Sequence, residues 1–265
     1  MENQARNRKQ DVRTRAATPD PYNAYCRVPG CSRPARAGTA DGLDRRYCRS
    51  HYDHFQSHGS LFKGSYKAKE LNPYRQAALR WILDHEDDLW VKHTLQKMSV
   101  LYSRAGAHVE AFRLRGMSPR ERAWAHWARL RKHIVDPRLP VAAWLAIEMI
   151  LRDDQQPDLR KEYKRVQAAK IVHRMASGSH RKWTTHYTRN NDPTRTMEYA
   201  QELHVYPRPR GRVLRHIGKD LEEACELIVE YHLASIHISK KARDKNGRYD
   251  SSPYPDRRSA RKRNS

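Results

Sequence analysis

The order of apolar and polar residues separates an irregular N-terminal segment from a longer series of predicted helices. From Asn72 to Arg104 the chain reads NPYRQAALRWILDHEDDLWVKHTLQKMSVLYSR, with no glycine and no proline after its opening. Apolar residues such as Ala78, Trp81 and Ile82 recur at steps of three and four. This spacing predicts one amphipathic helix over the whole range.

Local start and stop signals predict two more helices in the middle of the chain. Ser118, Pro119 and Glu121 provide an N-cap, a first-turn proline and a capping box, for a helix that runs to about Ile134. The apolar segment VAAWLAIEMIL, which follows Pro140, predicts a helix of the core.

The last third of the chain combines helical and irregular patterns. Helices are predicted within residues 157–178 and 211–240, and Gly218 is expected to weaken the second one locally. Residues 179–211 look irregular, with one short helix around Met197–Leu203. Strands are expected only in one short hairpin near the cysteines.

Three of the four cysteines lie within 23 residues and predict a zinc site. The pattern is Cys26-x4-Cys31, a spacer of sixteen residues, and Cys48-x2-His51. Two ligand pairs across such a spacer supply the four nitrogen and sulfur ligands of a tetrahedral structural zinc ion. A knuckle, a hairpin and a helix that carries the last two ligands together describe a treble-clef finger.

Two further histidines leave the fourth ligand open. His54 and His58 lie one and two turns beyond His51 on the predicted helix, and either could replace it. The x2 spacing from Cys48 favours His51.

The segment CRVPGCSRPARA…YCRSHYDHFQSHG resembles the zinc-binding segment of many phage and bacterial proteins, several of them HNH-type endonucleases. Their pattern is roughly C-x4-C-x-R-P…C-x2-H-Y…H-G. The resemblance implies that Cys26, Cys31, Cys48 and His51 bind zinc, and it places the protein in a phage or mobile element. It covers about 40 of the 265 residues.

The charge balance indicates a polyanionic partner. The 265 residues include 53 lysines and arginines against 30 acidic residues, a formal net charge of +23. Such an excess favours nucleic acid over a membrane surface, because no apolar run approaches the ~20 residues that span a bilayer. The first ten residues lack the apolar core of a secretory signal, so we expect a cytoplasmic protein with reduced cysteines.

Basic residues in four stretches are candidate nucleic-acid contacts. They surround the cysteines, occupy residues 112–132 and 160–182, and include the segment YPRPRGR. The candidates are Arg33, Arg36, Arg45, Arg46, Arg49, Arg120, Arg131, His180, Arg181, Lys182, Arg208, Arg210 and Arg212. Arginine pairs well with phosphate and guanine.

These patterns predict a mainly α-helical protein in four parts. Residues 1–22 form a disordered arm, 23–68 a treble-clef zinc module, 69–239 an α-helical domain and 240–265 a disordered basic tail.

The function expected from these features is zinc-dependent binding of nucleic acid, most simply duplex DNA, by a regulatory or accessory factor. The helical domain could also bind protein partners. One alternative is a metal-dependent, HNH-like nuclease with a diverged active site, for which His180, His186 and Asn190 are the best grouping. Another is an adaptor that binds RNA and protein. The histidines lack a carboxylate nearby in sequence, which favours a protein that is not an enzyme, although Asp192 or a distant acid such as Asp84 could be folded against them.

Overall fold

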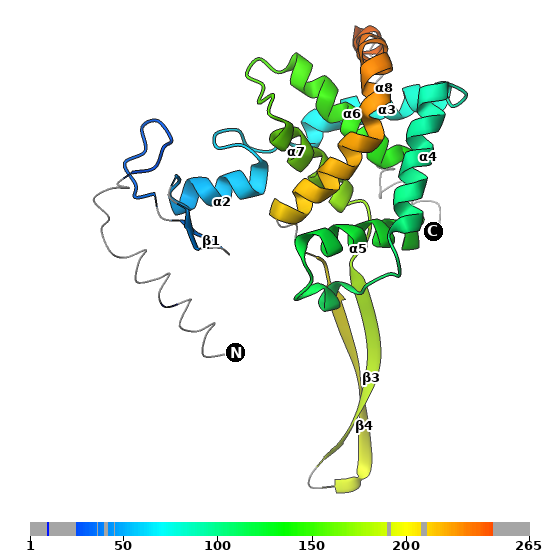
Figure 1. The fold of residues 1–265 in the computed structure, drawn as a ribbon. Helices are drawn as coiled ribbons and strands as arrows, with labels where there is room; N and C mark the ends of the chain where they lie inside the picture. The colour runs from blue at the N-terminus through cyan, green and yellow to red at the C-terminus, as the bar shows by residue number, and fades with distance from the viewer. Residues whose placement is uncertain are drawn as a thin grey trace.

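The protein consists of a small N-terminal module and a larger α-helical body, from which a long β-hairpin projects (Figure 1). The computed structural model describes residues 10, 25–35, 37–39, 42–44, 46–189, 192–207 and 211–245. Its elements are β1 (Ala37–Thr39), β2 (Gly42–Asp44), α2 (Arg49–His58), α3 (Ala68–Asp84), α4 (Leu89–Arg104), the 3-10 helix η1 (Ala111–Leu114), α5 (Pro119–Lys132), α6 (Arg138–Asp153), α7 (Lys161–His173), β3 (Ser179–Arg189), β4 (Asp192–Val205) and α8 (Gly211–Lys245). The predicted fold class, mainly α with an N-terminal module, is confirmed.

The two predicted disordered ends fall almost entirely outside the described residues. Only Gln10 is described within the predicted arm. At the other end, α8 continues to Lys245, into the first residues of the predicted tail.

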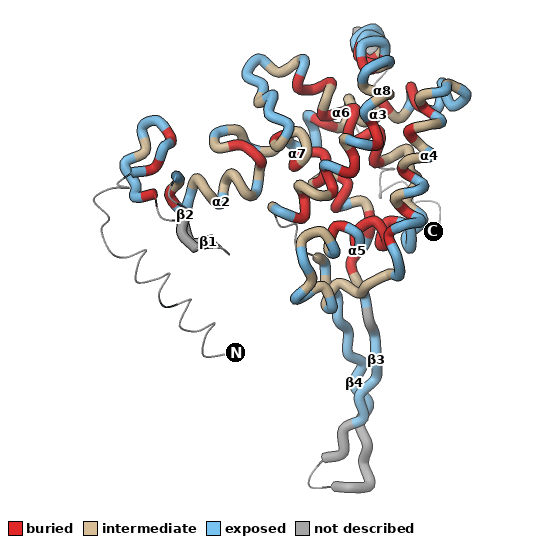
Figure 2. Tube along the Cα trace, viewed as in Figure 1, coloured by how far each residue is buried: buried red, intermediate tan, exposed pale blue. Residues whose placement is uncertain are grey.

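Helix α6 forms the centre of the body. Every residue from Pro140 to Ile147 is buried, because α6 contacts α3, α4, α7 and α8 around its circumference (Figure 2). A helix that is apolar on all sides is stable only in such a position, so the prediction of a core helix is correct. Neither α6 nor any other described helix combines the length and apolarity needed to cross a membrane.

Helix α8 crosses the body and packs closely on α7. A Cβ atom added to Gly218 would lie 2.6 Å from the carbonyl carbon of Arg165 in α7, far inside van der Waals contact. Gly218 therefore permits the close approach of α7 and α8. From the sequence, this glycine was expected only to weaken α8 locally.

Replacement of Gly218 by alanine is expected to lower the free energy of unfolding by about 1–2 kcal/mol. Alanine gains about 1 kcal/mol over glycine within a helix, but the added methyl group forces α7 and α8 apart. Urea denaturation monitored by circular dichroism measures the difference. Gly64→Ala is the control and should be close to neutral, because no atom lies within 4 Å of the added Cβ. A more stable Gly218→Ala protein would contradict this packing.

The predicted helix over residues 72–104 is two helices, which corrects the sequence interpretation. Helix α3 ends at Asp84, and α4 begins at Leu89. The carboxylate of Asp88 accepts hydrogen bonds from the backbone N–H groups of Trp90 (2.8 Å) and Val91 (3.1 Å). Asp88 is thus an N-cap rather than part of a continuous acidic helix face.

The start signals of α5 operate as predicted. The backbone N–H of Glu121 donates to the Ser118 hydroxyl at 3.3 Å, and the Glu121 carboxylate accepts the Ser118 N–H at 2.6 Å. Pro119 is the first residue of the helix. This reciprocal capping box satisfies two N–H groups that the helix itself leaves unpaired.

β3 and β4 pair as a long antiparallel hairpin, so the expectation of irregular structure with a short helix around Met197–Leu203 is wrong. Strands are also not confined to the hairpin near the cysteines. The pairing runs from Ser179 opposite Val205 to Thr188 opposite Thr196. The hairpin leaves the body beside α5 and projects from it (Figure 1).

The two faces of this hairpin differ in chemistry. The described side chains of residues 182–186 and 198–204 are all exposed. Trp183, Tyr199 and Leu203 share one face, by the alternation of a strand. The other face carries polar residues, among them His180 and Glu202. Because none of these described side chains is buried against the body, the hydrophobic pattern of a core-packed strand is weak here.

Candidate metal centre

The first two cysteines lie at the two ends of a tight turn. The backbone N–H of Cys31 donates to the carbonyl of Val28 at 3.0 Å. Gly30 has a φ of 75°, in the left-handed region where glycine carries no steric penalty. The N–H of Cys26 donates to the Arg33 carbonyl at 2.8 Å and closes the segment. The turn directs both sulfur atoms to one side.

The second ligand pair lies at the start of α2, and the β1–β2 hairpin brings it back to the turn. Cys48 is the extended N-cap residue of α2, and its carbonyl accepts the Tyr52 N–H at 2.9 Å. His51 lies in the first turn, on the same side as Cys48. A hydrogen bond of 2.8 Å from the Arg27 N–H to the Arg46 carbonyl holds the two halves together.

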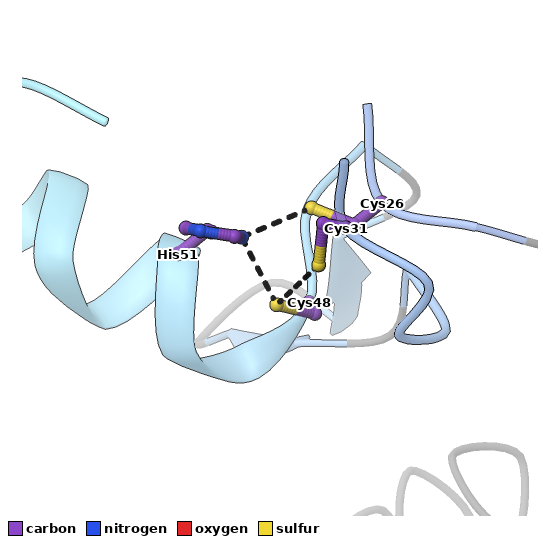
Figure 3. Close-up of side chains that lie close together, drawn as sticks. All are labelled: Cys26, Cys31, Cys48 and His51. Carbon is purple, nitrogen blue, oxygen red and sulfur yellow. Dashed lines mark hydrogen bonds between the residues drawn. The ribbon is translucent and has the colours of Figure 1, made fainter. Parts of the chain in front are cut away.

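The four side chains form one compact cluster (Figure 3). One sulfur or nitrogen atom from each residue lies within 4.8 Å of all the others. His51 Nδ1 lies 3.3 Å from Cys26 Sγ and 3.4 Å from Cys48 Sγ, and the sulfurs of Cys31 and Cys48 are 3.9 Å apart. Tetrahedral zinc, with bonds of about 2.3 Å to sulfur and about 2.0 Å to nitrogen, places its ligand atoms about 3.5–3.8 Å apart. The cluster can therefore hold a metal ion of this size.

The environment of the sulfurs suits a bound cation. Burial raises the pKa of Cys26, but backbone N–H groups of Cys48 and Val28 lower it further, so its pKa lies below the ordinary value. For Cys31 the backbone at Arg33 lowers the pKa, whereas burial and the neighbouring sulfurs raise it above the ordinary value. Three thiolates this close repel one another, and a metal ion relieves that repulsion.

The two alternative histidines lie outside the cluster. His54 Nδ1 donates to the Ser60 carbonyl at 2.9 Å. His58 Nδ1 lies 2.9 Å from the Ser65 hydroxyl and accepts from the Lys170 ammonium at 3.3 Å. Burial, with the Lys170 and His54 charges, lowers the pKa of His58 to about 4. Of the three histidines on α2, His51 is the one that the fold places beside the cysteines.

The end of α2 is attached to the helical body. The Gln167 amide donates to the His58 carbonyl at 2.9 Å, and the Arg215 guanidinium donates to the Phe55 carbonyl at 3.2 Å. Gly59 ends the helix with a φ of 75°, and a Cβ there would lie 2.7 Å from the Glu162 carbonyl oxygen. Contacts to the body thus begin before residue 68, where the sequence places the end of the module.

Three of the candidate nucleic-acid contacts are exposed near the cysteine cluster. Arg33, Arg46 and Arg49 are all exposed. Arg49 Nε donates to the Asp53 carboxylate at 2.7 Å, in an exposed pair that costs little to break. Arg36 and Arg45 lie outside the described residues.

Two other candidates are held by contacts within the body. Arg120 donates to the buried carboxylate of Asp220 at 2.6 Å. Arg131 donates to the carbonyls of Tyr102 (2.8 Å) and Ser103 (3.1 Å) at the end of α4. Both arginines already donate hydrogen bonds within the body, so a nucleic acid would have to share their guanidinium groups with these partners.

The remaining candidates lie on or next to the long hairpin. His180 and Lys182 share a face with Glu202, whose carboxylate lies beside the His180 ring and 3.7 Å from the Lys182 ammonium. Arg212 is exposed in the first turn of α8. The side chain of Arg181 and the residues Arg208 and Arg210 lie outside the description.

The histidines considered for a nuclease lie on the same hairpin. His186 Nδ1 is 3.5 Å from Glu198, and both side chains are exposed. Asn190 lies outside the described residues. Within the described part of the chain, the grouping of cysteine, histidine and acidic side chains that could hold a metal ion is the one formed by Cys26, Cys31, Cys48 and His51.

Fold and site together define an α-helical protein with an N-terminal Cys3His cluster that could bind a metal ion. Searches of family models, curated proteins and solved structures find no match to this chain. The likeness to HNH-type proteins therefore stays a resemblance of one segment.

Proposed function

We propose that the chain is a zinc-dependent nucleic-acid-binding protein, with duplex DNA as its partner. The observation that carries this proposal is the Cys3His cluster, whose spacing fits a structural metal ion and whose surroundings are rich in exposed arginines. Zinc is the ion that a set of three cysteines and one histidine favours.

The metal ion would have a structural role. Cys26, Cys31, Cys48 and His51 complete a tetrahedron, so no position is left for a reacting water molecule. Among the described residues, the buried apolar core of the module is Cys26, Val28 and Cys48, with Cys31, Tyr47 and Leu61 packed against it. So small an apolar cluster does not stabilise a fold alone, and ligand binding supplies the missing free energy.

The charge of the module supports a polyanionic partner. Arg27, Arg33, Arg46 and Arg49 are exposed around the ligands. The Arg46 guanidinium lies 5.5 Å from the ring centre of Tyr47, an arrangement that also suits stacking on a base. The formal net charge of +23 provides long-range attraction to phosphate.

The projecting hairpin supports duplex DNA in particular. The major groove of B-DNA admits a two-stranded β-ribbon, and several DNA-binding proteins place such a ribbon in a groove. β3 and β4 form a ribbon whose described side chains reach solvent on both faces. Its candidate contacts are His180, Arg181 and Lys182.

Neutralisation of the four module arginines is expected to weaken DNA binding and to reduce its salt dependence. Removal of one arginine–phosphate interaction lowers the slope of log K against log salt by about 0.9. The variant carries Arg33→Ala, Arg36→Ala, Arg45→Ala and Arg46→Ala. Fluorescence anisotropy with a labelled duplex, over a series of salt concentrations, measures both quantities.

A matched control removes four exposed charges from α3 and α4, at Lys69, Arg80, Lys92 and Arg104. This control loses the same net charge but keeps the module, so it should retain most of the salt slope. Equal losses of affinity in both variants would show that the protein attracts DNA through overall charge alone.

The phage setting and the two alternative functions rest on resemblance and charge. Incubation of plasmid DNA with the protein and Mg²⁺ or Mn²⁺ tests the nuclease alternative, and nicking that vanishes in His180→Ala or His186→Ala would establish it. A preference for single-stranded RNA over duplex DNA would favour the adaptor.

A further inference from the structure

A second polar site lies at the root of the long hairpin, far along the chain from the cysteines. An open cavity of about 280 Å³ is lined by the segment before α5, by α5 itself, by the ends of α7 and β4, and by the start of α8. The apolar part of its lining includes Val109, Leu114, Val205, Pro207 and Val213. The volume exceeds that of a single inorganic ion and approaches that of small-molecule sites.

The polar part of the lining contains a buried arginine that has no acidic partner among the described residues. Arg129 is only 4% exposed. Its Nη2 donates to His126 Nδ1 and to the His173 carbonyl, both at 3.0 Å, and its guanidinium lies 5.2 Å from the ring centre of Tyr206. Its Nε atom is buried without a hydrogen-bond partner, and no acidic side chain of the described residues forms an ion pair with it.

Such an arginine is costly to the folded protein. Burial lowers the pKa of Arg129, although Tyr206 partly opposes this, because the charged form loses its hydration. A buried cation is ordinarily paired with a carboxylate or another anion. The same helix shows the ordinary arrangement, since Arg120 donates to the buried carboxylate of Asp220. No acidic side chain of the described residues provides such a counterpart for Arg129.

Two buried histidines beside Arg129 add further hydrogen-bonding groups to the polar part of the lining. The rings of His126 and His173 stack with their centres 5.2 Å apart. Burial, with the Arg129 charge, holds the pKa of His126 well below its ordinary value and lowers that of His173 to about 3, so both rings are neutral at neutral pH. Because His126 Nδ1 accepts from Arg129, its proton resides on Nε2, which is buried without a partner.

Two more arginines line the cavity and raise its positive charge. Arg122 is half-buried, and its Nε has no hydrogen-bond partner; Arg115 is exposed at the edge. Among the described residues that line the cavity, none is acidic. Three arginines therefore line one space, to which the described lining residues bring no negative charge.

We propose that this cavity binds a small phosphate-bearing molecule. The phosphate lies against Arg122, Arg129 and His126, and the organic part of the molecule lies against the apolar part of the lining. A planar carboxylate satisfies one arginine through its two oxygens. A phosphate monoester presents three oxygens in different directions and carries up to two charges, which suits several guanidinium groups from separate positions. The proposal is independent of the zinc module and of DNA binding.

The test measures binding of phenyl phosphate to the full chain, with benzoate as the carboxylate of the same ring size. Thermal unfolding at constant ionic strength, balanced with chloride, reports a ligand that binds only the folded state. Titration calorimetry supplies the dissociation constant. We expect phenyl phosphate to raise the unfolding midpoint more than benzoate does, and inorganic phosphate to compete with it.

Three variants separate this site from general charge effects. Arg122→Ala removes a half-buried side chain and should weaken phenyl phosphate binding by about tenfold or more, as expected when a charge-assisted hydrogen bond is removed. Arg129→Met should abolish the ligand-dependent rise of the midpoint. Arg113→Ala, an exposed arginine on η1 that does not line the cavity, should leave binding unchanged.

The outcomes are decisive in both directions. If all three variants keep the same midpoint rise as the unaltered chain, phosphate acts through general screening and the proposal is wrong. If Arg129→Met does not fold, Arg122→Ala alone decides. Competition by a 5′-phosphorylated oligonucleotide, but not by its 5′-hydroxyl form, would assign the phosphate to a nucleic-acid end. Competition by a mononucleotide alone would assign it to a small molecule.

Discussion

Replacement of Cys48 by serine is expected to abolish metal binding and to unfold residues 25–51, while the helical body stays folded. Binding of structural zinc contributes about 10–16 kcal/mol to the folding of small modules, more than so small an apolar cluster supplies. Cys48 is 3% exposed and lies between His51 and Cys31, so its loss removes a central ligand.

The body should survive because its hydrophobic core is a separate cluster. The core of the body is built from α3 to α8 and contains none of the four candidate ligands. The last turn of α2 is also held by Gln167 and Arg215 of the body. Most of the far-ultraviolet helical signal is therefore expected to remain, whereas limited proteolysis should cleave within residues 25–51.

Cys225→Ser is the matched control, since it makes the same chemical change in the other core. Cys225 is fully buried in α8, where a serine hydroxyl without a partner costs about 1–3 kcal/mol. This variant should keep one zinc ion per chain by elemental analysis but unfold at lower urea. If Cys48→Ser retained its zinc, or lost all helical signal, the separate metal module would be disproved.

Removal of the Asp220 carboxylate is expected to lower the free energy of unfolding by about 3 kcal/mol. Asp220 is 4% exposed and joins α8 to α5 through two hydrogen bonds. Trp127 Nε1 donates to one oxygen at 2.8 Å, and Arg120 donates to the other at 2.6 Å. In Asp220→Ala the indole N–H remains buried without an acceptor, and the guanidinium loses its counter-charge.

Two comparisons make this prediction specific. Asp220→Asn keeps an acceptor for Trp127 and should cost less than alanine. Asp87→Ala removes an acid that is fully exposed and should change the free energy of unfolding by no more than about 0.5 kcal/mol. Urea denaturation of the three variants checks the order. Equal stability of Asp220→Ala and Asp87→Ala would mean that the α5–α8 contact does not depend on this carboxylate.

The sequence predicts those helices whose signals are local. The capping box of Ser118 and Glu121 starts α5 because its two hydrogen bonds need only residues three apart. The apolar segment after Pro140 forms the buried α6 because it has no polar face that could point to solvent. Both signals can be recognised from a few neighbouring residues, without knowledge of the rest of the fold.

The elements that were missed depend on competing local signals. The break at Asp88 was missed, because an N-cap aspartate and a surface aspartate look the same in a charged run. The long hairpin was missed although Trp183, Thr185 and Tyr187 alternate with other residues as in a strand, and the sequence Asn-Asn-Asp that follows is typical of turns. The polar residues between them mask the pattern when no face is buried.

The two sites differ in how far the sequence could reveal them. The cysteine cluster was predictable because its ligands come in two pairs, each fixed by a few residues of local structure. The cavity at the hairpin root was not, since His126 and Arg129 lie on one helix and His173 on another, and all three look like ordinary members of two basic clusters. They become buried where α5 meets the end of α7 and where Tyr206 packs on Arg129 and His173.

The root of the long hairpin has a consequence for how the protein could diversify. The hairpin begins after Gly178 and ends before Tyr206, and a Cβ on Gly178 would lie 2.9 Å from the Tyr206 Cα atom. When the two ends of an inserted segment lie side by side, the segment lowers the stability of the body only by the entropy cost of loop closure. This cost grows slowly with loop length. Evolution could therefore lengthen, shorten or exchange the hairpin as a unit, because the hairpin joins the helical body at two neighbouring points.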